Sequence, residues 1–83
     1  MRVVFKLFAT LTDYLPPERR GNCLELDVPD GTTVAGLIAR YRVPEKSAHL
    51  VLVNGVFVPP SDRASRQLAE GDELAVWPPV AGG

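Results

Sequence analysis

The sequence closes on Leu74-Ala75-Val76-Trp77-Pro78-Pro79-Val80-Ala81-Gly82-Gly83, an apolar run followed by a tail with almost no side chain. The apolar part is typical of a final β-strand, and the two prolines end it because neither has a backbone N–H to donate. Glycine has no Cβ, so a diglycine end can be threaded into a slot too narrow for any other residue. A frayed terminus has a similar composition, and the rest of the chain has to decide between these interpretations.

Length, charge and hydropathy narrow the class of protein. The chain has 83 residues, which make one domain with little room for a deep catalytic cleft beside its core. Nine Lys and Arg residues are scattered among ten Asp and Glu residues, so they give no sign of a basic patch that binds nucleic acid. No apolar run approaches the roughly 18 residues of a membrane span. We expect neither nucleic acid nor a membrane as a partner.

Cysteine usage and the first residues indicate the compartment. Cys23 is the only cysteine, which excludes an internal disulfide and a CxxC metal or redox motif. A single thiol without a disulfide framework is most simply explained by a reducing compartment. Residues 1–7 are too short and too interrupted by charge to be a signal peptide. We therefore expect a cytoplasmic protein.

Alternating apolar and polar residues predict two strands near the N-terminus, separated by a short helical turn and a polar connection. The turn residues Pro29-Asp30-Gly31 end the second strand. A short connection favours antiparallel pairing of the two. The core-facing positions would be Val3, Phe5, Leu7, Leu24, Leu26 and Val28.

One amphipathic helix is predicted in the middle of the chain. Thr33 is an acceptable N-cap directly before the periodic run. We expect the helix to end at Val43-Pro44, because the residue before a proline avoids the α region. The apolar stripe at positions i, i+3, i+4 and i+7 consists of Val34, Leu37, Ile38 and Tyr41.

Three short strands follow the helix. Residues 50–53 and 56–58 flank Asn54-Gly55, which predicts a hairpin with a type I′ turn. Residues 61–68 are polar and form a loop or one short helical turn, and residues 73–77 form the last strand. The element order β-β-α-β-β-β predicts an α+β domain, with one main helix packed on one face of a sheet of about five strands.

The usual catalytic constellations are missing from the sequence. His49 is the only histidine, so a His-based metal site or nucleophile–base pair cannot be built, and we expect this residue to flank a strand. Asp72 and Glu73 are adjacent and would point to opposite sides of a strand. We expect no metal site. A solvated loop is predicted around three further charged residues, Asp62, Arg63 and Arg66.

Residues 70–83, from Glu70-Gly71-Asp72 to Gly82-Gly83, closely resemble the ending of a known family. This is the MoaD/ThiS-like sulfur-carrier family, and the match is nearest to small subunits of molybdopterin synthase. Leu7-Phe8-Ala9 and Val53-Asn54-Gly55 agree too, so the resemblance covers the whole chain. Residues 12–20 lack the Arg-Glu that is common after the first strand, and residues 59–67 carry no family signature. These departures leave the pathway open.

The resemblance implies a ubiquitin-like β-grasp fold with a mixed sheet over residues 1–77 and a flexible tail over residues 78–83. In such a tail Gly83 carries the reacting carboxylate, and Gly82 lets the chain enter a narrow slot. Pro78 and Pro79 hold the root of the tail away from the sheet at low entropic cost. Val80 and Ala81 complete the part that is inserted into a partner.

The chemistry that the resemblance implies needs several partners. An ionised carboxylate is a poor acyl donor, so an E1-like enzyme first uses ATP to convert Gly83 to an acyl-adenylate. A persulfide-bearing donor protein then displaces AMP, which leads to a thiocarboxylate. The tail enters a large subunit of the molybdopterin synthase type, where the sulfur is transferred to a pterin precursor. The chain itself would bind no cofactor and would act as a cosubstrate or small subunit of the sulfurtransferase.

The partner surface can be predicted from strand parity. If Leu74 and Val76 face the core, Trp77 faces outward, and Phe8 likewise follows a core-facing Leu7. The first and last strands of a β-grasp are neighbours, so Phe8 and Trp77 could share a patch. The hairpin pairs Leu52 with Phe57 and Val53 with Val56, and inward valines would expose Leu52 and Phe57. Both faces of the hairpin are apolar, so parity alone leaves its orientation open. We predict an interface of Phe8, Phe57 and Trp77, although a covering helix or loop would make them core residues.

Three other functions remain open at this point. A related carrier could serve the thiazole of thiamine or a tungsten-pterin pathway. A ubiquitin-like modifier would instead join Gly83 to a lysine of a target protein. A β-grasp binding module with an inert tail would have no such chemistry.

Overall fold

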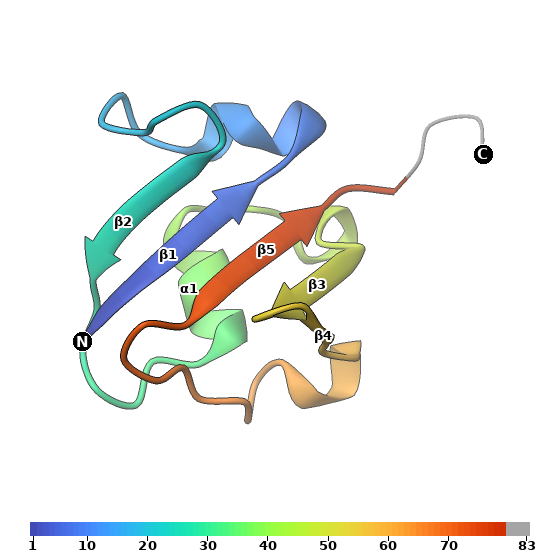
Figure 1. Cartoon of the computed structure of the whole chain (residues 1–83). Helices are drawn as coiled ribbons and strands as arrows, with labels where there is room; N and C mark the ends of the chain where they lie inside the picture. The colour runs from blue at the N-terminus through green and yellow to red at the C-terminus, as the bar shows by residue number, and fades with distance from the viewer. Residues whose placement is uncertain (80–83) are drawn as a thin grey trace.

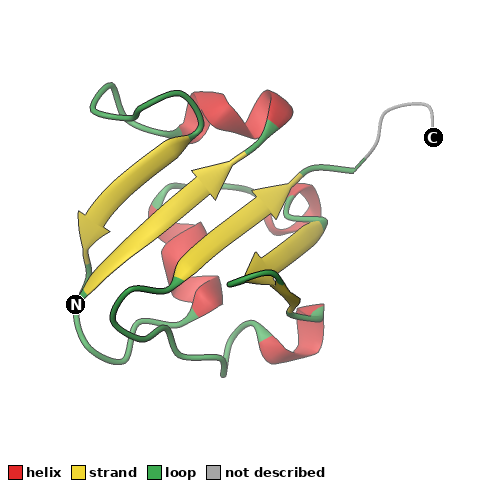
Figure 2. Ribbon diagram, viewed as in Figure 1, coloured by secondary structure: helices red, strands yellow, loops and turns green. Residues whose placement is uncertain are grey.

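The computed structural model describes residues 1–79. Five strands form one mixed sheet in the order β2-β1-β5-β3-β4, and α1 packs on one face of it (Figures 1 and 2). This arrangement confirms the predicted fold class. The strands are β1 (Arg2–Leu7), β2 (Cys23–Asp27), β3 (Leu50–Val53), β4 (Val56–Phe57) and β5 (Glu73–Trp77), the helix is α1 (Val34–Arg40), and the 3₁₀ turns are η1 (Ala9–Tyr14), η2 (Glu45–Ser47) and η3 (Pro60–Asp62).

The register places the last strand at the centre of the sheet. β5 runs parallel to β1 on one side and antiparallel to β3 on the other. β1 also pairs antiparallel with β2, as predicted, and β4 pairs with β3 at the opposite edge. The tail therefore leaves from the best-supported strand, at the end where β1 stops and β3 starts (Figure 1).

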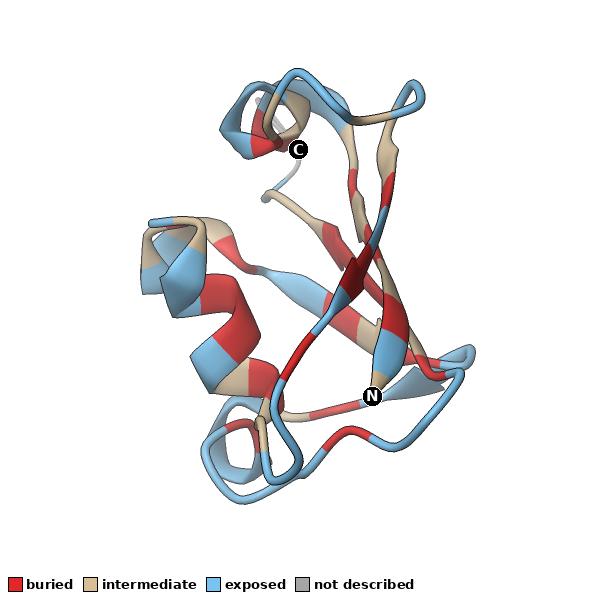
Figure 3. Cartoon of the chain, turned by 90° about the vertical axis from the view of Figure 1, so that its left-hand side faces the viewer, coloured by how far each residue is buried: buried red, intermediate tan, exposed pale blue. Residues whose placement is uncertain are grey.

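The core lies between α1 and the sheet, and Figure 3 shows the buried segments of both turned toward each other. Val34 and Leu37 are fully buried, and Ile38 is nearly so. The fourth predicted stripe residue, Tyr41, is partly buried, with its ring 5.5 Å from that of Phe5. The predicted core positions of β1 and β2 are all buried, namely Val3, Phe5, Leu7, Leu24, Leu26 and Val28.

Capping explains both ends of the helix. The Thr33 hydroxyl accepts a hydrogen bond from the Gly36 N–H (3.0 Å), which confirms the predicted N-cap. The predicted end at Val43-Pro44 is wrong, because α1 stops at Arg40. Arg42 adopts φ 61°, its N–H donates to the Ala39 carbonyl, and the Val43 N–H donates to the Ile38 carbonyl. These bonds form a Schellman motif, here with arginine in the left-handed position that usually holds glycine.

The hairpin between β3 and β4 follows the sequence prediction. Asn54 and Gly55 have φ values of 51° and 82°, and positive φ at both central positions is the mark of a type I′ turn. The predicted pairing of Val53 with Val56 is also found. The third predicted strand position, Val58, is buried and donates its N–H to the Val51 carbonyl just beyond β4.

Candidate functional site

The root of the tail is held on both sides by backbone hydrogen bonds. The Trp77 carbonyl at the end of β5 accepts a bond from the His49 N–H (3.0 Å), and the Val76 carbonyl accepts one from the Phe8 N–H (3.1 Å). Pro78 is half-buried and Pro79 is exposed. The strand prediction for residues 73–77 is confirmed. The flexibility of residues 78–83 stays a prediction.

Phe8 and Trp77 stack on each other beside this root. Their ring centroids are 4.1 Å apart and their planes differ by 5°. Both side chains are half-buried, while Leu74 and Val76 of β5 are fully buried on the helix side. The predicted proximity of the two rings is therefore confirmed, and they lie on the face of the sheet opposite α1.

The stacked rings belong to a larger apolar surface, the outer patch, which consists of Phe8, Leu50, Leu52, Phe57 and Trp77. The register places Leu50 opposite Trp77 and Leu52 opposite Phe57. Phe57 is 52% exposed and Leu50 is 38% exposed. Side chains that are directly opposite on one face of a sheet contact each other, so Leu50 and Leu52 connect the third predicted interface residue, Phe57, with the stacked pair.

The sequence analysis missed Leu50, which directly opposes Trp77 in the outer patch. Strand parity could have identified Leu50: Val51 and Val53 are both buried, so the alternate residues of β3, which include Leu50, face outward. Of the two paired hairpin valines, Val53 is buried, whereas Val56 is 68% exposed. Val56 lies in the edge strand β4, where both residues are exposed.

Charged residues border the outer patch on β1 and β2. Lys6 forms an ion pair with Glu73 (3.0 Å), and this hydrogen bond raises the pKa of the Lys6 ammonium above its usual range. Arg2 reaches Asp27 (3.3 Å) and Glu25 (3.8 Å). The outer face is thus apolar over β3, β4 and the end of β5, and charged over β2, most of β1 and the start of β5 at Glu73.

A buried acid fixes the start of β5. Asp72 is 8% exposed, and its carboxylate accepts hydrogen bonds from the Asn54 side-chain amide (2.8 Å) and the Ala69 N–H (2.8 Å). The Asn54 side-chain oxygen in turn accepts one from the Glu73 N–H (2.9 Å). The hairpin turn and the last strand are thereby joined, a role that the sequence analysis did not assign to Asp72.

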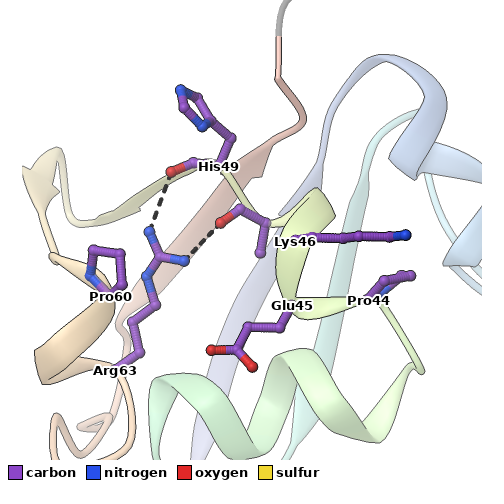
Figure 4. A pocket seen from close by; sticks show the side chains of 7 residues that line it. Pro44, Glu45, Lys46, His49, Pro60 and Arg63 are labelled. Atoms are coloured by element: carbon purple, nitrogen blue, oxygen red, sulfur yellow. Dashed lines mark hydrogen bonds between the residues drawn. The ribbon is translucent and has the colours of Figure 1, made fainter.

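Arg63 corrects the predicted solvated loop. Asp62 and Arg66 are exposed, but Arg63 is only 6% exposed. Its guanidinium donates to the carbonyls of Val58 (3.2 Å), Ala48 (2.6 Å) and His49 (3.1 Å), two of which Figure 4 shows. Burial lowers the pKa of Arg63, and the nearby Glu45 charge opposes this shift. The carbonyls come from two other segments, so no local pattern revealed the buried site.

The part of the chain that the structure describes holds little else that could react. No group of three or more His, Cys, Asp or Glu residues that could hold a metal occurs within residues 1–79. Within the same range, no helix is long and apolar enough to cross a membrane. The predicted tail residues Val80, Ala81, Gly82 and Gly83 lie outside the described residues.

Comparison with known sequences adds the family. A model of the ThiS family matches residues 6–83. The chain belongs to the ThiS family. This confirms the MoaD/ThiS-like resemblance and makes the protein a member of a family of sulfur carriers with the ubiquitin-like β-grasp fold. No curated protein matches the chain significantly.

Several solved structures share this fold. SAMP1 from Haloferax volcanii is 27% identical over the full length of both chains, with a TM-score of 0.68. A putative molybdopterin converting factor subunit 1 from Pyrococcus furiosus is 23% identical, with 95% of this chain and 98% of that chain covered and a TM-score of 0.67. A complex of subunits 1 and 2 of molybdopterin-converting factor from Helicobacter pylori 26695 gives 18% identity, full coverage of both chains and a TM-score of 0.60.

Proposed function

We propose that this ThiS-family protein carries sulfur as a thiocarboxylate on Gly83 and donates it in the biosynthesis of molybdopterin. The observation that supports this most directly is the stacked pair of Phe8 and Trp77, which lies in an exposed apolar patch at the root of the tail. Patches of this kind with large aromatic residues mark protein interfaces. A partner that binds the patch would therefore bind at the root of the segment that ends in Gly82-Gly83.

The proposed chemistry begins at the Gly83 carboxylate. ATP supplies AMP to this carboxylate and releases pyrophosphate, which turns a poor leaving group into a good one. A donor persulfide attacks the acyl carbon and expels AMP, so that an acyl disulfide forms. A second thiol then attacks the donor-cysteine sulfur of this acyl disulfide, so that the S–S bond breaks, the thiocarboxylate leaves and a disulfide forms on the donor. In the acceptor enzyme, the thiocarboxylate sulfur displaces an oxygen leaving group from a carbon of the precursor, and water cleaves the resulting thioester, which regenerates the carboxylate and leaves the sulfur on the product.

Three partners follow from this sequence of steps. No described residue offers an ATP site, so we assign activation to an E1-like adenylating enzyme and the sulfur to a protein that carries a persulfide. We assign the final transfer to a large subunit of the molybdopterin synthase type. The Helicobacter pylori structure is a complex of subunits 1 and 2 of a molybdopterin-converting factor, which supports such a partner. Thiol chemistry of this kind suits a reducing cytoplasm.

The intact mass of the protein purified from its own cells tests the proposal. A sulfur carrier is expected to show a fraction of molecules heavier by the exchange of one oxygen for sulfur, located at Gly83 by fragmentation. Alkylation should label that fraction at the C-terminus, whereas a fraction labelled only at Cys23 would indicate ordinary thiol chemistry. Complete absence of the heavier form from cells that make the cofactor would contradict the proposal.

A second function is favoured by a specific similarity. One structure at 26% identity is described as small archaeal modifier protein 1 from the same Haloferax species, so a role in protein modification is the main alternative. A modifier would form an isopeptide bond between Gly83 and a target lysine, and the conjugates would persist on a denaturing gel. A carrier for thiamine thiazole would give the same thiocarboxylate, and growth requirements of a deletion strain would distinguish the two products.

A further inference from the structure

Arg63 is held as a cation but is not neutralised by a contact. Its guanidinium makes three hydrogen bonds, all to neutral carbonyls, and an arginine side chain has more N–H groups than three bonds use. Among residues 1–79, no carboxylate lies within 4.0 Å of it. The attraction between a buried, unpaired cation and an added anion is stronger than the attraction at an exposed cation, because water screens the buried charge less.

A hollow gives outside groups access to this cation. It lies between η2 and the start of β3 on one side and η3 on the other, and its lining includes Pro44, Glu45, Ala48, Pro60 and Arg63. Lys46 and His49 also line the hollow, although Figure 4 shows their side chains directed away from the Arg63 guanidinium, which faces the side of the hollow that holds the Glu45 carboxylate. Glu45 is exposed, so it can move into solvent when another carboxylate takes its place.

The hollow is connected to the root of the tail by two consecutive hydrogen bonds. Arg63 donates to the His49 carbonyl (3.1 Å), and the His49 N–H donates to the Trp77 carbonyl (3.0 Å). The next residue along β3, Leu50, belongs to the outer patch and pairs with Trp77. A protein that surrounds the root of the tail therefore comes close to the Arg63 hollow as well as to the outer patch.

We propose that the Arg63 hollow is a docking site for an acidic side chain of the protein that binds the tail. The inference rests on the proposed function for the identity of that protein, but the carboxylate site itself follows from the hollow and its cation. The guanidinium keeps N–H groups beyond those that bond to the three carbonyls, and a carboxylate accepts N–H groups of a cation in a charge-assisted contact. The site adds a charge requirement to the apolar contact made by the outer patch.

Short blocked peptides test the carboxylate site without sulfur, ATP or a partner. N-acetyl-Ala-Glu-Ala-amide and its Gln counterpart would be titrated into the full chain, with NMR shifts followed at the Arg63 Nε–H group and the Ala48 and His49 amides. We expect saturable shifts at these groups and roughly fivefold tighter binding of the Glu peptide, the effect of one partly screened ion pair. Equal binding of both peptides, or no shift at these groups with either, would overturn the proposal.

Two substitutions sharpen the test while leaving Arg63 in place. Glu45→Gln should tighten binding of the Glu peptide by roughly two- to fivefold, because it removes the competing carboxylate, whereas the exposed control Glu18→Gln should not. No change in Glu45→Gln would contradict the proposal. Tighter binding of a Pro-Pro-Val-Ala-Gly-Gly peptide with a free carboxylate than of the Glu peptide would instead identify the occupant as this chain's own tail.

Failure of the proposed function and failure of this inference give different results. If the mass measurement showed no thiocarboxylate but the Glu peptide still bound, the proposed identity of the partner would be wrong and the carboxylate site would stand. A thiocarboxylate without peptide binding would keep the sulfur carrier and remove the site. Trp77→Ala should leave the peptide affinity unchanged, since it changes only the outer patch.

Discussion

The Trp77 indole lies against the Phe8 ring at a centroid distance of 4.1 Å, with the two planes within 5°. Phe8 follows β1 and Trp77 ends β5, and these strands are parallel neighbours. The pair therefore marks the point at which the chain leaves the sheet for the tail. Each ring covers part of the other and leaves the rest exposed for a partner.

Trp77→Ala should weaken binding to the synthase-type partner by at least about 2 kcal/mol, or roughly thirtyfold, as for a central aromatic anchor. Folding stability should fall by much less than for a core substitution, because Trp77 is half-buried and faces away from α1. Calorimetric titration and thermal melts measure the two quantities. Unchanged affinity together with a collapsed melting temperature would make Trp77 a core residue and remove the proposed interface.

Phe8→Ala should reproduce both effects of Trp77→Ala. Because the two rings stack, the double variant should lose less affinity than the sum of the single losses. The same titrations complete this double-mutant cycle. Strictly additive losses would mean that each ring contacts the partner independently of the stack.

Leu37→Ala should lower the free energy of unfolding by about 2–5 kcal/mol, the usual cost of a large-to-small core change. Leu37 is fully buried between α1 and the sheet, and such a loss is a large part of the stability of a small domain. Arg40→Ala on the exposed side of the same helix is the control and should cost under about 0.5 kcal/mol. Chemical denaturation that gave equal losses would contradict the assigned helix face.

Arg63→Met should destabilise the protein by about 3–5 kcal/mol, since it leaves the buried carbonyls of Val58 and Ala48, and the partly buried carbonyl of His49, without their donor. The exposed Arg66 belongs to the same loop, and Arg66→Met should change stability by under about 0.5 kcal/mol. Urea denaturation of the two variants measures the difference. Similar stability of both would show that water replaces the guanidinium at low cost.

Local patterns predicted most of the fold, because strand parity and helical periodicity are carried by neighbouring residues. Parity was enough to place Phe8 and Trp77 on the same face once their strands were taken as neighbours. Arg63 could not be found in this way, since its acceptors lie 5 to 15 positions away in two other segments. The end of α1 was also missed, because Arg42 adopts the left-handed conformation that ends the helix. This conformation is usually adopted by glycine or asparagine, so an arginine gives no sign of it in the sequence.

Deleting Gly83, or replacing Gly82 with valine, should abolish sulfur acceptance and leave the melting temperature nearly unchanged. Pro79 after the last strand is exposed, so we expect the residues beyond it to add little buried area to the folded domain. Sulfur acceptance should be lost because the adenylating partner must receive the carboxylate of Gly83 in its active site. Valine at position 82 adds a branched Cβ that a slot fitted to glycine would reject.

Mass spectrometry after incubation with the activating enzyme, ATP and a persulfide donor measures sulfur acceptance, and calorimetric melts measure stability. Ala81→Gly is the matched control, since it changes the tail without adding bulk and should keep acceptance. A truncated chain that still accepted sulfur would place the chemistry away from Gly83. A truncated chain that lost several kcal/mol of stability would instead mean that the tail packs on the domain. Either result would contradict the proposal that the tail enters a partner and carries sulfur on Gly83.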